Sequence, residues 1–167
     1  MGEELTRKDV ERIKEEIEHR SGEVRTEILE ALKEARAQGD LSENFEYYAA
    51  KRDNRINNSR INYLERMLKN ATIISDESAE DEVGLNNTVE LYFPEDDLTE
   101  TYRLVTSIRG DSLNNKISKE SPIGKAILGH KAGETVTVVV NEDYSYEVKI
   151  LSIENTGDDG TDKINSY

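Results

Sequence analysis

Two acidic side chains, Asp40 and Glu43, lie three residues apart in the short segment Gly39–Tyr47 that separates two helical patterns. Asp-x-x-Glu is a capping-box pattern, in which Asp40 would cap the second helix and Glu43 would reach back to it. The same carboxylates could bind Mg²⁺, which takes one or two protein carboxylates and fills its other positions with water and phosphates. Both interpretations stay open, because Asp40 could cap with one oxygen and coordinate with the other. Two acids alone would bind Mg²⁺ weakly, so no tightly bound metal is expected in the free protein.

A basic stretch follows these acids. Residues 51–69 carry six basic side chains against two acidic ones, in a chain whose formal net charge is −14. The six are Lys51, Arg52, Arg55, Arg60, Arg66 and Lys69. Arg36, on the preceding helix, is expected to lie near them. The stretch is either an ordinary solvated helix face or a phosphate-facing strip, beside which Tyr47 or Tyr48 could stack on a base.

Hydrophobic spacing predicts that two long helices position these groups. The first pattern has apolar residues at spacings of three and four between residues 10 and 35, with His19–Gly22 as its one weak point. The second pattern consists of Phe45, Tyr48, Ile56, Ile61, Leu64, Leu68 and Ala71. Gly39 is placed to end the first helix in the left-handed conformation, and so short a connection requires antiparallel helices. The narrow stripe is typical of a coiled-coil hairpin that stands alone, roughly 45 Å long.

The second half of the chain changes to a strand pattern. Alternating or continuous apolar residues predict strands at 89–93, near 102–108, at 136–140 and at 144–150. Ser121 as N-cap, Pro122 at the first helical position and Gly129 as the stop predict one short helix. The expected fold class is α+β. It comprises an antiparallel coiled-coil hairpin in 1–75, an acidic linker in 76–84, a small antiparallel-sheet domain with one short helix in 85–154, and a disordered tail in 155–167.

Composition removes several function classes. The acidic balance argues against a whole-protein electrostatic grip on nucleic acid or on an anionic membrane. The chain has no Cys, which excludes a disulfide scaffold, a cysteine-based zinc site and thiol catalysis. His19 and His130 are far apart in sequence and are interpreted as incidental. No stretch approaches 18 apolar residues, so we expect a soluble cytoplasmic protein with no membrane partner.

Several motifs occur in order along residues 6–154. They are Ala35-Arg36, Gly39-Asp40-Leu41-Ser42-Glu43-Asn44, Glu46-Tyr47, Ala49-Ala50-Lys51, Lys116-Ile117-Ser118, Ser121-Pro122-Ile123-Gly124-Lys125 and Lys131-Ala132-Gly133-Glu134. Through them the sequence resembles the bacterial Gre transcript cleavage factors, most closely those of the GreA type. The Gly39–Asn44 motif is highly specific in this context, and the Ser-Pro-Ile-Gly segment behind it makes a chance similarity improbable.

The resemblance implies an FKBP-like fold for the second domain, which would dock on bacterial RNA polymerase through Ser121, Pro122 and Ile123. It implies that the hairpin enters the secondary channel of the polymerase. There Asp40 and Glu43 would help to hold the second Mg²⁺ of the polymerase active site while a backtracked RNA 3′ end is cleaved. The residues expected to face this RNA are Asn44, Arg36, Lys51, Arg52 and Arg55. The polymerase is then the catalyst, so this chain is expected not to be an enzyme and to have no cofactor of its own.

Two alternatives remain open. Phe45 stands where the family usually has a small residue, and the Ile108–Leu113 segment does not match the family's acidic Glu-Ala-Asp segment. Both features are compatible with a paralogue that occupies the channel and inhibits transcription without cleavage. The other alternative is a prolyl isomerase that uses the FKBP-like domain, against which the absence of Trp argues, because such pockets are lined with aromatic residues including Trp.

Overall fold

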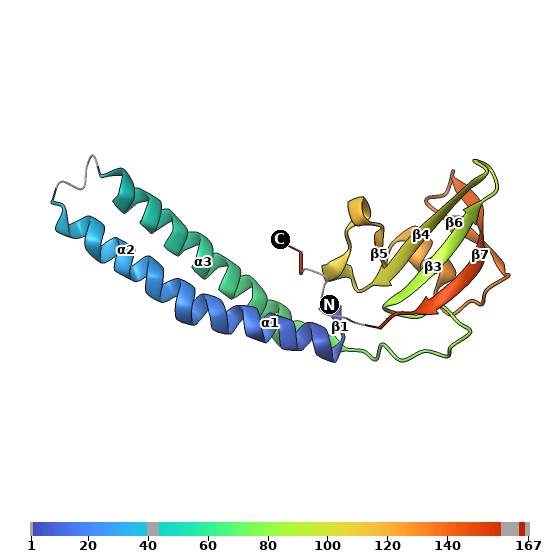
Figure 1. Cartoon of the computed structure of the whole chain (residues 1–167), viewed down its shortest axis with the longest axis horizontal. Helices are drawn as coiled ribbons and strands as arrows, with labels where there is room; N and C mark the ends of the chain where they lie inside the picture. The colour runs from blue at the N-terminus through green and yellow to red at the C-terminus, as the bar shows by residue number, and fades with distance from the viewer. Residues whose placement is uncertain (1, 40–43, 158–163, 166–167) are drawn as a thin grey trace. The chain divides into compact units, whose positions relative to one another are not determined.

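The computed structural model describes residues 2–39, 44–157 and 164–165 of the chain, which divides into two compact units. The first unit contains the stretch Arg7–Thr72, and the second contains Glu3–Thr6 together with Ile73–Ser166. The first is a helical hairpin and the second is a mixed sheet with one short α-helix (Figure 1). The fold class is therefore α+β, as the sequence predicts.

The hairpin has two long arms. One arm consists of α1 (Arg7–His19), a π-helical turn η1 (Arg20–Val24) and α2 (Arg25–Ala37), and the other is α3 (Phe45–Asn70). Figure 1 shows α2 and α3 side by side and antiparallel. At about 1.5 Å per residue, an α3 of 26 residues is about 39 Å long.

The weak point of the first helical pattern becomes the π-helical turn η1. Gly22 has a low helix propensity, and the Ser21 hydroxyl donates to the Ile17 carbonyl at 2.7 Å, a local bond that competes with regular helix geometry. The Arg20 carbonyl accepts a hydrogen bond from the Arg25 N–H, five residues on. It also accepts one from the amide of Asn57 on α3 at 2.8 Å. The widened turn is therefore held from the opposite arm of the hairpin.

The contact face of α3 differs from the expected stripe. Ile61 and Leu64 are buried as predicted, but Phe45, Tyr48 and Ile56 are exposed. The buried positions of α3 are Ala50, Asn57, Arg60, Ile61, Leu64 and Met67. Asn57 replaces Ile56 in the seam because its amide is the group that bonds to Arg20. Apolar spacing alone could not show this, since the seam is polar at its middle.

The second unit is built on a five-stranded sheet. Its strands are β3 (Asn87–Phe93), β4 (Leu98–Val105), β5 (Lys116–Ser118), β6 (Thr135–Val139) and β7 (Ser145–Asn155), in the order β5-β4-β3-β7-β6. Alternate residues of these strands join Ile127 of α4 (Pro122–Ile127) in the core. The core residues are Val83, Val89, Leu91, Leu104, Ile127, Val136, Val138, Val148 and Ile150.

One strand pair departs from the expected antiparallel sheet. β3 pairs antiparallel with β4 and with β7, and β6 pairs antiparallel with β7. β4 and β5 are parallel, because the chain returns between them through two short 3₁₀ turns, η2 (Ser107–Arg109) and η3 (Ser112–Asn114). The sheet is therefore mixed.

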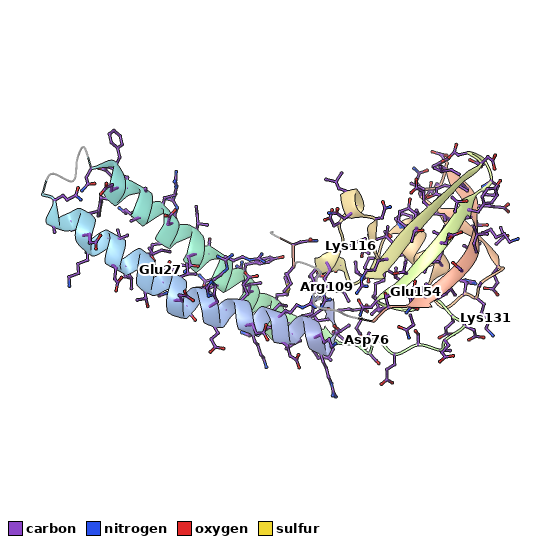
Figure 2. The ribbon with its side chains drawn as sticks, viewed as in Figure 1. Glu27, Asp76, Arg109, Lys116, Lys131 and Glu154 are labelled. Carbon is purple, nitrogen blue, oxygen red and sulfur yellow. The ribbon has the colours of Figure 1, made fainter. Side chains whose placement is uncertain are left out.

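The unit boundaries differ from the expected ranges of 1–75 and 76–84. Near the N-terminus, β1 (Glu4–Leu5) pairs with β2 (Thr72–Ile73), which groups residues 3–6 with the second unit. The end of the expected linker is also part of this unit, because Val83 is buried in its core and exchanges backbone hydrogen bonds with Gly129 and His130 at 2.8 Å each. Lys131, labelled in Figure 2, forms an ion pair with Asp81 at 3.3 Å.

The first residues of the expected disordered tail, 155–157, have defined structure. Asn155 is the last residue of β7, and Thr156 donates to the Asn86 carbonyl at 2.7 Å. The Gly157 carbonyl accepts a hydrogen bond from Arg103 at 2.6 Å. The N–H of Asn165 donates to the Ile108 carbonyl at 2.6 Å. Residues 158–163 and 166–167 lie outside the described residues, so the prediction is not tested there.

Candidate functional site at the hairpin end

The first arm of the hairpin ends as the sequence predicts. α2 stops at Ala37, and the N–H groups of Gln38 and Gly39 donate to the carbonyls of Ala35 and Arg36, both at 3.3 Å. Gly39 has a φ of 97°, which is the left-handed conformation that favours glycine. A Cβ at this position would meet nothing within 4 Å, so the backbone conformation and not space requires glycine.

Asn44 is the N-cap of α3. Its side-chain oxygen accepts from the Tyr47 N–H at 3.0 Å, which satisfies one of the unpaired donors of the first turn. Its side-chain nitrogen donates to the Ala35 carbonyl of α2 at 2.6 Å. The buried amide thus joins both arms where the chain reverses. This corrects one prediction, because the N-cap of α3 is Asn44 and not Asp40. That Asn44 also faces the RNA stays a prediction.

Asp40 and Glu43 lie outside the described residues. In the sequence they lie between Gly39, just after the end of the first arm, and Asn44, which caps the second arm. Since Asn44 already caps α3, that cap requires neither carboxylate. Within the described ranges, no three His, Asp or Glu side chains gather where they could hold a metal ion.

Tyr47 and two cations form a cluster beside the chain reversal. The Arg36 guanidinium carbon lies 5.9 Å from the centre of the Tyr47 ring, and the Lys51 Nζ lies 6.0 Å from it. Both distances are within the range of a cation–π interaction. Tyr48 packs edge-on against Tyr47 with ring centres 5.5 Å apart. The prediction that Arg36 lies near the basic stretch across the hairpin is confirmed.

The six basic residues of α3 do not form one uniform strip. Lys51, Arg52 and Arg55 are exposed and have no ion pair with any described residue, so their charges face solvent near the chain reversal. Arg60 is only 8% exposed, because it binds Glu16 of α1 through Nε at 2.9 Å and Nη2 at 3.3 Å. Arg66 and Lys69 are exposed near the far end of α3.

Glu16 is held by two arginines. Arg20 donates to its Oε2 at 2.8 Å, in addition to the fork from Arg60. Partial burial by itself raises the pKa of the Glu16 carboxyl, but the hydrogen bonds and charges of Arg60 and Arg20 outweigh it, so the pKa is lowered. Arg60 is therefore a structural cation of the hairpin, unlike Lys51, Arg52 and Arg55.

The predicted docking segment lies at the start of α4 in the second unit. Ser121 is its N-cap, with the hydroxyl accepting from the Gly124 N–H at 3.1 Å and donating to the Ser118 carbonyl at 2.6 Å. Pro122 is exposed at the first helical position, and Ile123 packs partly against the core. A Cβ on Gly124 would lie 2.1 Å from the Ser118 carbonyl oxygen, so this turn requires glycine. The short helix is confirmed, and it ends at Ile127.

Sequence reasoning missed two contacts that shape the hairpin end. One is the cap by Asn44, which the pattern of Asn at the position just before a helical run could have indicated. The other joins Gln38 to Glu46, whose side chains are 3.1 Å apart across the chain reversal. No spacing rule predicts this pair, because Gln38 follows the end of α2 and Glu46 lies on α3.

The chain combines a helical hairpin unit with a mixed-sheet unit, and comparison with known proteins identifies its family. The family model described as "Transcription elongation factor, N-terminal" matches residues 3–73, and "Transcription elongation factor, GreA/GreB, C-term" matches residues 77–155. The chain belongs to the GreA/GreB family of transcription elongation factors. Within the described ranges, every helix is too short or too polar to span a membrane.

Curated relatives agree with this assignment. The chain is 44% identical over 150 residues to a transcription elongation factor GreA of Caldanaerobacter subterraneus subsp. tengcongensis, covering 89% of this chain and 95% of that protein. It is 40% identical over 153 residues to a transcription elongation factor GreA of Streptococcus pneumoniae, covering 91% and 95%. A crystal structure of GreA factor homolog 1 (Gfh1) of Thermus thermophilus is 28% identical, with a TM-score of 0.43, covering 92% of this chain and 99% of that one.

Proposed function

We propose that this protein binds bacterial RNA polymerase in the cytoplasm, inserts the hairpin end into the secondary channel and stimulates Mg²⁺-dependent cleavage of backtracked RNA. The observation that carries the proposal is the cap by Asn44. Because Asn44 is the N-cap of α3, the helix does not need Asp40 or Glu43 as a cap. The family membership supports the same function, and the relatives named GreA do not favour the inhibitory alternative.

In this proposal Asp40 and Glu43 act in trans. Their carboxylate oxygens would help to hold an Mg²⁺ ion in the polymerase active site, and such an ion would supply activated water and stabilise the leaving oxygen. The protein's own contribution is to carry the two acids on the end of a narrow two-helix rod, whose second arm is about 39 Å long. A site inside another molecule is accessible to such a rod. The polymerase remains the catalyst.

The exposed cations give the hairpin end a second function. Arg36 and Lys51 flank the Tyr47 ring, and Arg52 and Arg55 are exposed on the same part of α3. Phosphate groups of an RNA 3′ segment would bind these cations, and the neighbouring Tyr48 ring could stack on a base. This arrangement would hold the RNA beside the acids.

Docking on the polymerase is assigned to the second unit, with Pro122 as its exposed apolar contact at the start of α4. Ser121 and Ile123 position this proline, since one caps the helix and the other packs on the core. The Ile108–Leu113 segment differs from the family pattern and carries Leu113, which is 94% exposed.

The experiment measures RNA length in stalled elongation complexes of the cognate polymerase, with and without the protein and Mg²⁺. Stimulated cleavage predicts short 3′ fragments whose release is faster with the protein and requires Mg²⁺. Slower elongation without any shortening of the RNA would contradict the proposal and identify an inhibitor that occupies the channel. The double variant D40N/E43Q tests the two carboxylates in the same complexes.

A further inference from the structure

A small pocket lies in the second unit between the β3–β4 turn and the β6–β7 turn. Its volume is about 240 Å³, and it is lined by Phe93, Glu95, Asp96, Tyr144, Tyr146 and Glu147. Sites for small-molecule ligands usually measure about 300–1,000 Å³. The pocket is thus the size for one side chain rather than for a cofactor. It lies on a different unit from the hairpin cations and acids.

Aromatic rings form the floor of the pocket. Phe93 on β3 contacts Tyr102 on β4 with ring centres 6.3 Å apart and Tyr146 on β7 at 6.2 Å, and Tyr146 contacts Tyr144 at 5.7 Å. Phe93, Tyr102 and Tyr146 pack against the same core as Ile127 of α4, but they are only partly buried. Tyr144 is 52% exposed. Three partly exposed rings, those of Phe93, Tyr144 and Tyr146, therefore line the pocket at this end of the sheet.

Carboxylates surround these rings. Of the described residues that line the pocket, Glu95, Asp96 and Glu147 are acidic and none is basic. Burial, with the neighbouring tyrosines, raises the pKa of the Tyr146 phenol, so this ring is neutral at physiological pH. The pocket thus combines π-faces with negative charge, and both attract a cation.

Hydrogen bonds hold both turns in place. In the β3–β4 turn, the Asp96 N–H donates to the Phe93 carbonyl at 3.2 Å, and the Tyr92 hydroxyl donates to Asp97 at 2.8 Å. In the β6–β7 turn, the Tyr144 carbonyl accepts from Val140 at 3.0 Å and from Asn141 at 3.2 Å. The backbone that carries Asp96 and Tyr144 is therefore held before any ligand binds, which lowers the entropic cost of binding.

We propose that this pocket binds the guanidinium group of an arginine presented by an exposed segment of a partner protein. A guanidinium stacks flat on aromatic rings and donates in pairs to carboxylates, and the pocket offers both kinds of group. A lysine ammonium is a compact, strongly hydrated charge that makes fewer such contacts. The proposal does not depend on transcript cleavage, because none of these residues lies in the hairpin.

The test is an NMR titration of the ¹⁵N-labelled full chain with N-acetyl-arginine amide. The expected result is a saturable shift of amide signals from residues 93–96 and 144–147. The citrulline analogue, which has the same shape without the charge, should bind at least roughly 5-fold more weakly. The absence of a saturable shift, or equal shifts with citrulline or lysine, would overturn the proposal. Shifts from a proline peptide in place of arginine would instead indicate a proline-binding pocket and overturn it too.

Matched variants locate the binding site. Tyr144→Ala and Glu147→Gln change exposed residues of the pocket, and each should weaken arginine binding by at least roughly 3-fold. Glu142→Gln removes an exposed acid of the same turn that does not line the pocket, and Tyr48→Ala removes an exposed ring of the hairpin. Both controls should bind as the wild type does. Equal weakening by Glu142→Gln would show a diffuse attraction to acidic surface and contradict the pocket.

Discussion

At the scale of single residues, Asn44 joins the two arms of the hairpin through both polar atoms of its side chain. Asn44→Ala should lower the free energy of unfolding of the hairpin by about 1–2 kcal/mol, because it removes the N-cap and leaves the Ala35 carbonyl without this donor. Asn44→Asp keeps an acceptor for the Tyr47 N–H but not the donor to the Ala35 carbonyl. The loss of stability in Asn44→Asp should therefore be smaller than in Asn44→Ala. Urea unfolding followed by circular dichroism measures both. Wild-type stability for Asn44→Ala would contradict the assigned role.

Glu16 gives the hairpin a predictable dependence on pH. Its pKa in the folded protein is below the ordinary value of 4.5, so its contribution to stability is complete above that value and is lost as pH falls through the folded pKa. Glu16→Gln should therefore destabilise the protein by roughly 1 kcal/mol at pH 7, and the difference from wild type should shrink below about pH 4.5. Urea unfolding of the two proteins between pH 3 and 7 measures this. A difference that grows on acidification would contradict the ion pairs with Arg60 and Arg20.

At the scale of the helices, two glycines of the same arm should respond in opposite directions to alanine. Gly22 lies in η1, where a Cβ would meet nothing within 4 Å, so Gly22→Ala should stabilise by about 0.5–1 kcal/mol. Gly39 also has open space but a φ of 97°, so Gly39→Ala should destabilise by about 1 kcal/mol or more. Thermal unfolding compares the two variants. The same sign for both would show that backbone conformation does not distinguish these positions.

The exposed cations of α3 provide a test of RNA contact at the same scale. Replacing Arg52 and Arg55 by Gln should weaken cleavage stimulation at limiting protein, because these cations are exposed near the chain reversal. Arg66→Gln with Lys69→Gln removes the same charge from the far end of α3, about 20 Å further along the helix. The distal pair should keep near-normal activity in the RNA cleavage assay. Equal losses for the two pairs would indicate a general effect of charge and contradict a local RNA contact.

At the scale of the whole molecule, the repeating patterns were the predictable part. Apolar spacings of three and four predicted the two helical arms. Gly39 predicted the end of the first arm and Ser121 the start of α4, and the structure confirms both. The prediction of the buried face of α3 was partly wrong, since Asn57 is buried in place of Ile56. Its partner Arg20 lies on the other arm, far away in sequence. The parallel pairing of β5 could not be predicted either, because it depends on the path of the 106–115 connection.

The candidate site was predictable in composition but not in the division of roles. The sequence indicated acids, cations and tyrosines around residues 36–55, and the structure brings Arg36, Tyr47 and Lys51 together. The Asp-x-x-Glu pattern suggested Asp40 as the cap of α3, whereas the neighbouring Asn44 has this role. Asp and Asn are both favourable N-cap residues, and the structure shows that Asn44, four residues after Asp40, is where the second arm meets Ala35.

The central claim is that Asp40 and Glu43 act on the Mg²⁺ of the polymerase and not on the fold of the hairpin. The most direct measurement is the rate of RNA cleavage in stalled complexes against Mg²⁺ concentration, with saturating wild-type or variant protein. The variant D40N/E43Q should lose stimulation by about 100-fold or more, because it lacks both metal ligands, yet compete with wild type for the channel. Glu46→Gln, which changes a neighbouring carboxylate that contacts Gln38, should retain stimulation. Full stimulation by D40N/E43Q would contradict the claim.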